Sequence, residues 1–218
     1  MIDWNQIKTV FLDMDGTLLD LHFDNYFWLE HLPLRYAELK GVPYRDAVNR
    51  LERMYQQLYG SLNWYCLDFW ADSLDLDIAN LKREVSERIR YRPNAQRFLQ
   101  YIHDQGFDIA LVTNAHQKSI EIKLEQTDLG SLINEIICSH DFQLPKEQVE
   151  FWPALKKSRP YNPAMTAFFD DNEAVLHSAR ANGIAHLYAI AQPDSQKAPR
   201  TEGEFPMLVD FLELLPGS

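Results

Sequence analysis

Two aspartates separated by one residue, Asp13 and Asp15, follow a short apolar run and precede a glycine. The run from Thr9 to Leu12 is β-branched and apolar without alternation, which is typical of a strand buried on both faces. Residues i and i+2 of an extended chain point to the same side, so we expect both carboxylates to share one small space. Two like charges that close are costly unless a cation or a proton lies between them.

The same residues have a simpler interpretation, because Asp-x-Asp-Gly also occurs in turns and in calcium loops. The rest of a calcium loop is missing here: counted from Asp13, position five is Thr17 and position twelve is Asp24. A carboxylate pair at the carboxyl end of a buried strand is where open α/β sheets bind ligands. This position favours a functional role over a simple turn.

Composition limits the possible partners. The 218 residues carry a formal charge of -11, so the surface as a whole repels nucleic acid and anionic lipid. We expect neither a nucleic acid nor a membrane as partner. A protein this acidic that handles a phosphate must build a local positive site from a metal ion and one or two cationic side chains.

The cysteines and the N-terminus indicate a compartment. Cys66 and Cys138 fit no metal spacing, and thiols in a reducing cytosol explain them better than a disulfide. The N-terminus has neither a basic nor a long apolar region, and no apolar run approaches the ~20 residues that span a bilayer. We expect a soluble, cytoplasmic protein.

The segment from Leu21 to about Arg90 reads as helices only. We predict helices over residues 24–40 with a kink or break at Pro33, over 44–58, from a cap at Asn63, and from a cap at Asp77. Four helices with short loops make a bundle of about 70 residues. We therefore predict a core domain of residues 1–20 and 91–218, interrupted by a helical domain of residues 21–90.

From Pro93 onward strands alternate with helices, which predicts an α/β fold with a doubly wound parallel sheet. The predicted strands are residues 109–112, 133–138, 164–169 and 184–190; the predicted helices are 95–102, one through about Gln126, one from Lys146, 173–182, and a closing helix, 207–215. Pro153 should kink the helix from Lys146 or mark the start of a second segment. Residues 192–204 read as a polar loop.

Polar residues recur at successive strand ends or helix starts. They are Asp13 with Asp15, Thr113 with Asn114, Lys146, and Asp170 with Asp171. The carboxyl ends of the strands in a doubly wound sheet converge on one crevice, so we expect these side chains to meet. The set contains what phosphoryl transfer needs. Asp13 can be the nucleophile, and Asp15 can protonate the leaving oxygen and later take a proton from water.

The remaining members of the set can hold a metal ion and a phosphate. Mg²⁺ prefers hard oxygen ligands, and Asp13 and Asp171 are the best candidates, with the Asp15 main-chain carbonyl and Asp170 assisting. Lys146 supplies a point charge for the phosphoryl group. The predicted phosphate-binding residues are Gly16, Thr113, Asn114 and Lys146.

Each member of the set also has an ordinary interpretation. Thr113 and Asn114 could simply begin a helix, and Lys146 alone could be a surface lysine. The acidic pair at Asp170 could be the usual charge bias at a helix N-terminus. Together, in this order and at strand ends, these residues are improbable by chance.

This combination resembles the haloacid dehalogenase-like superfamily of phosphohydrolases over essentially the whole chain. Asp13 and Asp15 match its motif I, Thr113 motif II, Lys146 motif III, and the Asp170-Asp171 pair motif IV. The insertion after the first strand is similar to the C1 cap subtype. Dehalogenase members lack the second motif I aspartate, so Asp15 implies phosphatase chemistry.

The sequence departs from the family pattern at one point. Motif IV often has a further acidic residue three or four positions after its aspartate, but Ala174 and Val175 stand there. Metal ligation in motif IV therefore rests on Asp170 and Asp171.

Three stretches, 13–28, 62–68 and 111–116, resemble the bacterial GMP/IMP nucleotidase branch, which implies removal of the 5′-phosphate from purine mononucleotides. The aromatic residues of the cap are consistent with base stacking, although a packed helical core explains most of them. The candidate substrate contacts are one or two of Phe23, Asn25, Tyr26, Trp64 and Tyr65. His116 could contact substrate or be a solvated residue at a helix start.

Other functions remain open from the sequence. A broad sugar-phosphate phosphatase or a phosphomutase would use the same motifs and cap type. A module that only binds a phospho-ligand is a further alternative, although all catalytic positions are intact. A cap that closes over the site should hinge near residues 19–21 and 90–93.

Overall fold

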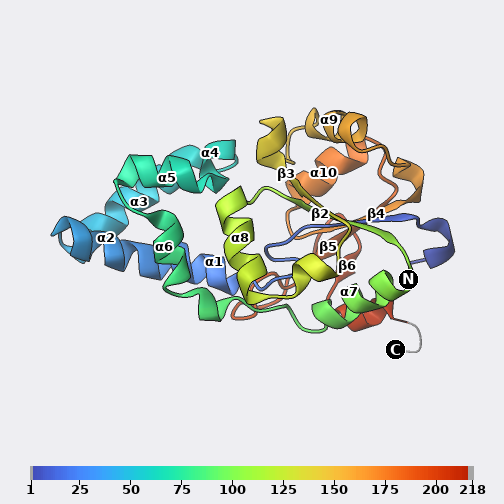
Figure 1. Ribbon diagram of the computed structural model, residues 1–218, viewed down its shortest axis with the longest axis horizontal. Helices are drawn as coiled ribbons and strands as arrows, with labels where there is room; N and C mark the ends of the chain where they lie inside the picture. Colours follow the sequence, from blue (N-terminus) through green and yellow to red (C-terminus); the bar gives the residue numbers. More distant parts are fainter. Residues whose placement is uncertain (1, 216–218) are drawn as a thin grey trace.

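A computed structural model describes residues 2–215 and centres on a sheet of six parallel strands (Figure 1). The strands are β1 (Thr9–Leu12), β2 (Asp108–Thr113), β3 (Glu135–Cys138), β4 (Thr166–Asp170), β5 (His186–Ile190) and β6 (Met207–Leu208). Their order is β3-β2-β1-β4-β5-β6, all neighbours being parallel. The predicted doubly wound α/β fold is confirmed, and its topological switch point lies between β1 and β4.

Helices cover both faces of the sheet (Figure 1). They are α7 (Ala95–Asp104), α8 (Gln117–Gln126), α9 (Phe151–Ser158) and α10 (Glu173–Ala181). In β1, Val10 and Leu12 pack with the α7 and α8 side, whereas Phe11 packs with α9 and α10. All four residues of β1 are buried, and three of them, Val10, Phe11 and Leu12, are apolar, as expected of a strand covered on both faces.

The remaining helices gather beside the sheet in a group that we call the helical lobe, residues 22–88 (Figure 1). They are α1 (His22–Tyr26), a π-helical segment (Phe27–His31), α2 (Leu32–Lys40), α3 (Tyr44–Leu58), α4 (Leu62–Tyr65), α5 (Leu67–Leu74), α6 (Ile78–Arg83) and a 3₁₀ turn (Ser86–Arg88). Buried lobe residues such as Leu51 and Trp70 belong to the same hydrophobic cluster as the α7 side of the sheet. The lobe is therefore packed against the rest of the described chain, residues 2–21 and 89–215, which we call the sheet domain.

Two chain segments connect the lobe to the sheet domain, and they run side by side. The Asp20 N–H donates to the Arg90 carbonyl at 2.9 Å, and the Arg92 N–H donates to the Leu18 carbonyl at 2.9 Å. These are the segments where we predict the hinges. Paired in this way, they would move together.

The helix caps in the lobe differ in part from expectation. Asn63 does not cap a helix but lies inside the short α4, because α4 begins at Leu62 with Ser61 at its N-cap. The Cys66 Sγ accepts the Phe69 N–H at 3.4 Å and caps α5 instead. Asp77 caps α6 as predicted, since its side chain accepts the Asn80 N–H at 2.9 Å.

Pro33 is the second residue of α2, but α2 continues directly from the preceding helical segment, because its N-cap residue His31 also has helical backbone angles. A proline inside a continuous helix removes the N–H that would bond one turn back. The irregularity predicted at this proline is found one turn earlier, as the π-helical segment Phe27–His31. The helical stretch also begins at His22, two residues before the predicted start.

The C-terminal prediction was wrong. Residues 207–215 do not form a closing helix: Met207 and Leu208 are strand β6, and a 3₁₀ turn, Phe211–Leu214, follows. Met207 and Leu208 pair with β5 instead, and this pairing satisfies the hydrogen-bonding groups of their main chain at the edge of the sheet.

The segment around Lys146 also differs from expectation, because Lys146 lies in a loop and α9 begins only at Phe151. Pro153 is then in the first turn of α9, which agrees with its predicted alternative role at the start of a second segment. Three strands, β3, β4 and β5, begin two residues later than predicted.

Both cysteines, Cys66 and Cys138, are free thiols, as expected. Within residues 2–215, no helix combines the length and the apolar character that crossing a membrane requires.

Candidate active site

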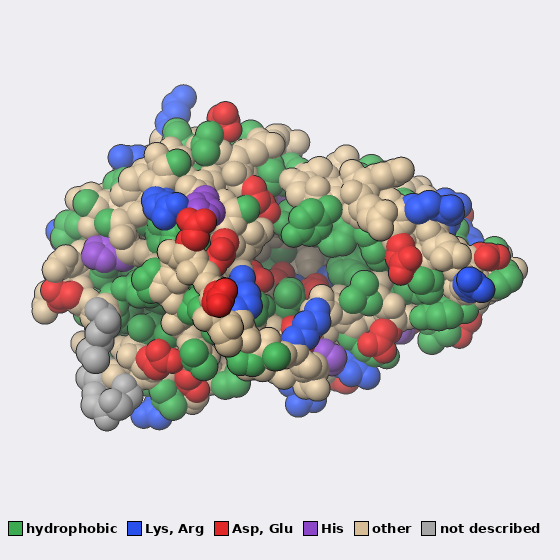
Figure 2. All heavy atoms as spheres, turned by 180° about the vertical axis from the view of Figure 1, so that it is seen from behind, with side chains coloured by type: hydrophobic (Ala, Val, Ile, Leu, Met, Phe, Trp, Pro, Cys, Tyr) green, Lys and Arg blue, Asp and Glu red, His purple; other side chains and the backbone are tan. Residues whose placement is uncertain are grey.

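A pocket of about 350 Å³ opens at the carboxyl ends of β1, β2 and β4, with walls from the helical lobe. Seen from behind, the surface is hollowed between the two parts of the molecule (Figure 2). Its lining includes the strand-end residues singled out above: Asp13, Asp15, Thr113, Asn114, Lys146, Asp170 and Asp171. This is the crevice where doubly wound sheets bind ligands, and its size suits a small molecule.

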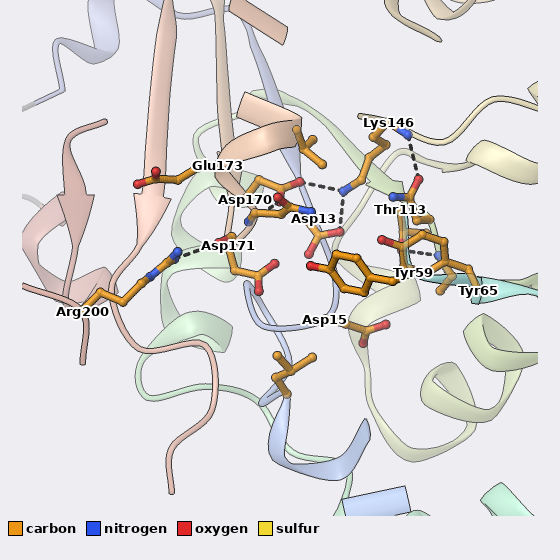
Figure 3. Close-up of a pocket in the computed structure, with 15 residues that line it drawn as sticks. Asp13, Asp15, Tyr59, Tyr65, Thr113, Lys146, Asp170, Asp171, Glu173 and Arg200 are labelled. Atoms are coloured by element: carbon orange, nitrogen blue, oxygen red, sulfur yellow. Dashed lines mark hydrogen bonds and ion pairs between the residues drawn. The ribbon is translucent and has the colours of Figure 1, made fainter. Parts of the chain in front are cut away.

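The ammonium group of Lys146 lies between two carboxylates (Figure 3). Its Nζ donates to Asp13 Oδ1 at 2.6 Å, to Asp170 Oδ2 at 2.7 Å and to the Val112 carbonyl at 3.0 Å, which uses all three of its N–H groups. Burial alone would lower the pKa of Lys146, but Asp13 and Asp170 outweigh burial and raise it. The ammonium therefore stays charged in this buried position.

Asp13, Asp170 and Asp171 form an acidic cluster, with one oxygen of each within 4.8 Å of the others. Burial and the other two carboxylates raise the pKa of Asp171 well above its ordinary range, and burial raises the pKa of Asp170 to about 7. Such shifts mean that three anions here are unfavourable without a cation. A set of carboxylate oxygens like this fits a divalent cation with hard ligands, such as Mg²⁺.

Gly16 fits against this cluster. Its φ is +86°, and a Cβ on it would lie 2.8 Å from both Cγ and Oδ2 of Asp171. Only glycine tolerates both the left-handed backbone and the close approach. Gly16 therefore allows the Asp171 carboxylate to occupy its place, and its phosphate-binding role stays a prediction.

The end of β2 is joined to the Lys146 loop by the Asn114 amide. Its Oδ1 accepts the Lys146 N–H at 2.9 Å, which fixes the main chain of the lysine without a helix. The Thr113 Oγ1 accepts the Ala115 N–H at 3.0 Å, so the hydroxyl is held at the turn after β2.

Glu147, which the sequence did not single out, connects the loops around the pocket. Its Oε2 accepts from Asn114 Nδ2 at 2.8 Å, and its Oε1 accepts from Asn172 Nδ2 at 3.2 Å. The same Oε1 accepts from the Tyr65 hydroxyl of the lobe at 2.9 Å. Burial, followed by Glu147, raises the pKa of Tyr65, so its phenol stays protonated and donates.

Asp13 and Asp15 line the same pocket, as expected, but their carboxylates have different partners, because β1 ends at Leu12 and the chain turns. The Asp15 carboxylate points away from the acidic cluster (Figure 3), and its Oδ1 accepts from Lys123 Nζ at 2.5 Å. Lys123 Nζ also donates to Asp24 Oδ2 of α1 at 2.9 Å. Burial raises the pKa of Asp15 to about 6, although Lys123 opposes this rise.

Two lobe tyrosines, Tyr59 and Tyr65, line the pocket, and their rings lie across it from Arg200 (Figure 3). Tyr65 is among the predicted substrate contacts, whereas Tyr59 is not. Tyr59 is 76% exposed, and its ring meets that of Trp64 in a T-shaped arrangement, with ring centroids 5.9 Å apart. An exposed aromatic ring at the mouth of a polar pocket is available to a ligand.

The other predicted lobe contacts do not line this pocket. Phe23 is buried beside Lys82 and Lys123, with its ring centroid 5.3 and 5.6 Å from their Nζ atoms. Trp64 belongs to an aromatic cluster with Trp28, Tyr55 and Trp70. Both residues serve as core.

Asn25, Tyr26 and His116 also point elsewhere. The Asn25 Nδ2 donates to Asp194 Oδ2 at 2.6 Å, and the Tyr26 ring lies under the Arg88 guanidinium at 3.8 Å. His116 caps α8 through Nδ1, and its ring contacts that of His140 edge-on.

Lys123, Tyr59, Glu147 and Arg200 were missed from the sequence. Arg200 donates to the main-chain carbonyls of Asp171 and Ile190 from the polar loop 192–204. Of these four residues, only Glu147 had a signal in the sequence, because it directly follows the predicted Lys146. The positions of the other three depend on how distant segments of the chain pack.

Comparison with known proteins gives three kinds of match. The sequence pattern of the family described as haloacid dehalogenase-like hydrolase matches residues 10–189. The GMP/IMP nucleotidase YrfG of Escherichia coli (strain K12) is 37% identical over 99% of this chain and 97% of that protein. A phosphoglycolate phosphatase of Pseudomonas fluorescens is 24% identical over 96% of this chain and 79% of that protein.

The fold is also found among solved structures. A HAD phosphatase from Thermococcus onnurineus superimposes with a TM-score of 0.78 at 18% identity, over 95% of this chain and 96% of that one. This likeness concerns the fold.

Proposed function

Because the chain belongs to the haloacid dehalogenase-like hydrolases, we propose that it is a Mg²⁺-dependent phosphatase that removes the 5′-phosphate of purine nucleoside monophosphates. The observation that carries the proposal is the pairing of Asp13 with Lys146 beside the acidic cluster, in a pocket walled by lobe tyrosines. The 37% identity to a GMP/IMP nucleotidase supports this choice of substrate.

In the proposed reaction Asp13 attacks the phosphorus in line with the ester oxygen. A bond forms between an Asp13 carboxylate oxygen and phosphorus, and the bond from phosphorus to the nucleoside oxygen breaks. Asp15 donates a proton to that oxygen, so the nucleoside leaves as an alcohol. Asp15 then takes a proton from the water that attacks the aspartyl-phosphate, which restores Asp13 and releases phosphate.

Lys146 holds Asp13 in place and offers positive charge to the transferred group, as Thr113 and the main chain of Asn114 offer hydrogen-bond donors. Asp13, Asp170 and Asp171, with the Asp15 main-chain carbonyl, would hold the cation. A bound Mg²⁺ would screen the phosphoryl charge and orient that group toward Asp13.

The lobe would supply substrate selection. Residues 21–90 would act as a cap on a core of residues 1–20 and 91–218, with Tyr59 and Tyr65 placed to contact the nucleoside. A cap also limits water near the aspartyl-phosphate, which must admit one water and exclude others.

A substrate panel tests the proposal. Phosphate release with Mg²⁺ should have a higher kcat/KM for GMP and IMP than for pyrimidine nucleotides, glucose phosphate or phosphoglycolate. A preference for phosphoglycolate or a hexose phosphate would contradict the nucleotidase assignment. Return of the phosphate to a second sugar position, detected by chromatography, would identify a mutase.

A further inference from the structure

A second buried lysine contacts the other carboxylate of the first motif. Lys123 is 1% exposed, and its Nζ lies 2.5 Å from Asp15 Oδ1 and 2.9 Å from Asp24 Oδ2. Asp24 Oδ1 in turn accepts from Lys82 Nζ at 2.7 Å, and Lys82 is 2% exposed. The four side chains form a line of alternating charge from Asp15 to Lys82, which we call the bridging network.

The bridging network crosses from the sheet domain to the helical lobe. Asp15 follows β1 and Lys123 is on α8, whereas Asp24 is on α1 and Lys82 is on α6. Lys82 Nζ also contacts Ser119 Oγ of α8 at 3.3 Å. Lys123 therefore pairs with Asp15 of the sheet domain on one side and with Asp24 of the lobe on the other.

The surroundings of the network leave the ammonium groups few other partners. The ring centroids of Phe23, Phe27 and Trp28 lie 5.3, 5.2 and 5.5 Å from Lys82 Nζ. Rings attract a cation but do not replace a carboxylate, so a buried ammonium that loses its carboxylate is strongly unfavourable. Lys123 therefore constrains where the Asp15 carboxylate can lie.

That place suits proton transfer to the leaving group. In an in-line displacement the leaving oxygen departs on the side of the phosphorus opposite to Asp13. A general acid must therefore lie away from the acidic cluster, and Asp15 points away from it toward Lys123 (Figure 3).

We propose that Lys123 is a positioning residue that holds the Asp15 carboxylate for proton transfer, and that Asp24 and Lys82 make this position depend on the placement of the lobe. The inference rests on the proposed acid and base role of Asp15. It predicts a defect in proton transfer, whereas a purely structural lysine would affect all substrates alike.

The test compares two substrates that differ in their need for a proton. The nucleoside of a 5′-monophosphate leaves as an alkoxide unless its oxygen is protonated. The p-nitrophenyl group of p-nitrophenyl phosphate, in contrast, leaves as a stable anion. For each, kcat/KM reports the steps through transfer of the phosphoryl group to Asp13. In Lys123→Met we expect kcat/KM for the nucleotide to fall about 100-fold, and that for p-nitrophenyl phosphate to fall less than about threefold.

Lys118→Met is the matched control, because Lys118 is on the same helix and its side chain is 51% exposed. It should leave the ratio of the two kcat/KM values at that of the parent protein. Equal loss on both substrates in Lys123→Met, or no loss on either, would overturn the inference.

Two further variants separate the possible failures. Asp24→Asn, which keeps Lys123 but removes its lobe partner, should change the ratio in the same direction by about tenfold, and it decides the question if Lys123→Met does not fold. An unchanged ratio in Asp24→Asn would overturn the dependence on the lobe. If Asp15→Asn changes the ratio and Lys123→Met does not, this inference alone fails. If Asp15→Asn leaves the ratio unchanged, the acid role and the inference fail together.

Discussion

Two buried lysines divide the paired aspartates between two regions of the molecule. Lys146 holds Asp13 together with Asp170, and all three lie at strand ends or loops of the sheet domain. Lys123 holds Asp15 together with Asp24, which belongs to the helical lobe. The same arrangement, one ammonium between two carboxylates, fixes the proposed nucleophile Asp13 within the sheet domain and links the proposed general acid Asp15 to the lobe.

The difference separates two tasks. A nucleophile and a metal site need a rigid frame, which parallel strand ends provide. A group that acts only when substrate is enclosed gains from contact with the part that encloses it. The bridging network links Asp15 to the lobe through Lys123 and Asp24.

The largest effect is expected for Lys146→Met. It leaves Asp13 and Asp170 buried without their cation, which should cost about 3–5 kcal/mol of unfolding free energy. Unlike Lys123→Met, it should lower kcat/KM for nucleotide and p-nitrophenyl phosphate alike, because phosphoryl transfer itself suffers. Urea unfolding and both assays measure this, with Lys157→Met on the exposed side of α9 as the control. Loss confined to the nucleotide would contradict the contrast.

Gly16→Ala should disturb the sheet-domain site alone. The added Cβ would meet the Asp171 carboxylate, so we expect the Mg²⁺ concentration for half-maximal activity to rise about tenfold. Gly106→Ala is a close control, since Gly106 has φ +75° and nothing within 4 Å of a built Cβ. It shares the backbone strain but should leave the Mg²⁺ requirement as it is. If both variants reach half-maximal activity at the same Mg²⁺ concentration, the close approach of Gly16 to Asp171 does not affect metal binding.

Asp24→Asn should change how the unfolding free energy depends on pH, because it removes one carboxylate of the bridging network. Burial by itself would raise the pKa of Asp24, but Lys123 and Lys82 outweigh burial and hold the pKa at about 2, below its ordinary 3.8. A carboxylate with a lowered folded-state pKa stabilises the protein above its unfolded pKa, and this stabilisation is lost as the pH falls toward 2. The unfolding free energy of the parent should therefore exceed that of the variant by about 2 kcal/mol at neutral pH, and this difference should disappear in acid.

Denaturant unfolding between neutral pH and acid measures that gap. Asp75→Asn is the control, because Asp75 pairs with Lys40 at 2.9 Å while its side chain is 96% exposed. Exposed pairs contribute little, so its stability should follow the parent. A gap for Asp24→Asn that stays constant with pH would contradict the pKa assignment.

Tyr59→Ala should have the smallest effect and should be limited to binding. If the exposed ring stacks on a base, its loss should raise KM for GMP about tenfold with little change in kcat. KM for ribose 5-phosphate, which lacks the base, should stay unchanged. Tyr44→Ala is the control, because its exposed ring lies outside the pocket, and it should leave KM unchanged for both GMP and ribose 5-phosphate. An equal rise for ribose 5-phosphate would rule out base contact by Tyr59.

The two regions also differ in how far the sequence predicts them. Asp13, Thr113 and Asp171 meet in space as predicted because each lies at or directly after a strand end, and parallel strands bring their carboxyl ends together. Lys146 joins them from a loop, which the Asn114 side chain holds. Lys123 carries no such signal, because it is one lysine on a helix of ambiguous period and its partner is 99 residues away.

The lobe shows the same limit. Its helices follow from apolar periodicity, but periodicity does not show which aromatic ring faces the pocket. Trp64, on the short α4, packs in the aromatic cluster, whereas Tyr59 follows the end of α3 and stays exposed. Residues 207–215 were predicted wrongly because two apolar residues at a sheet edge give no period to distinguish strand from helix.

The proposed aspartyl-phosphate can be detected directly, as phosphate transferred to Asp13. Parent protein mixed with Mg²⁺ and GMP carrying a radiolabelled phosphate, then quenched in acid and digested, should yield label on the peptide that contains Asp13. Asp13→Asn should yield no label and should lose turnover by about 10³-fold or more. Label on another residue, or full turnover in Asp13→Asn, would contradict the account.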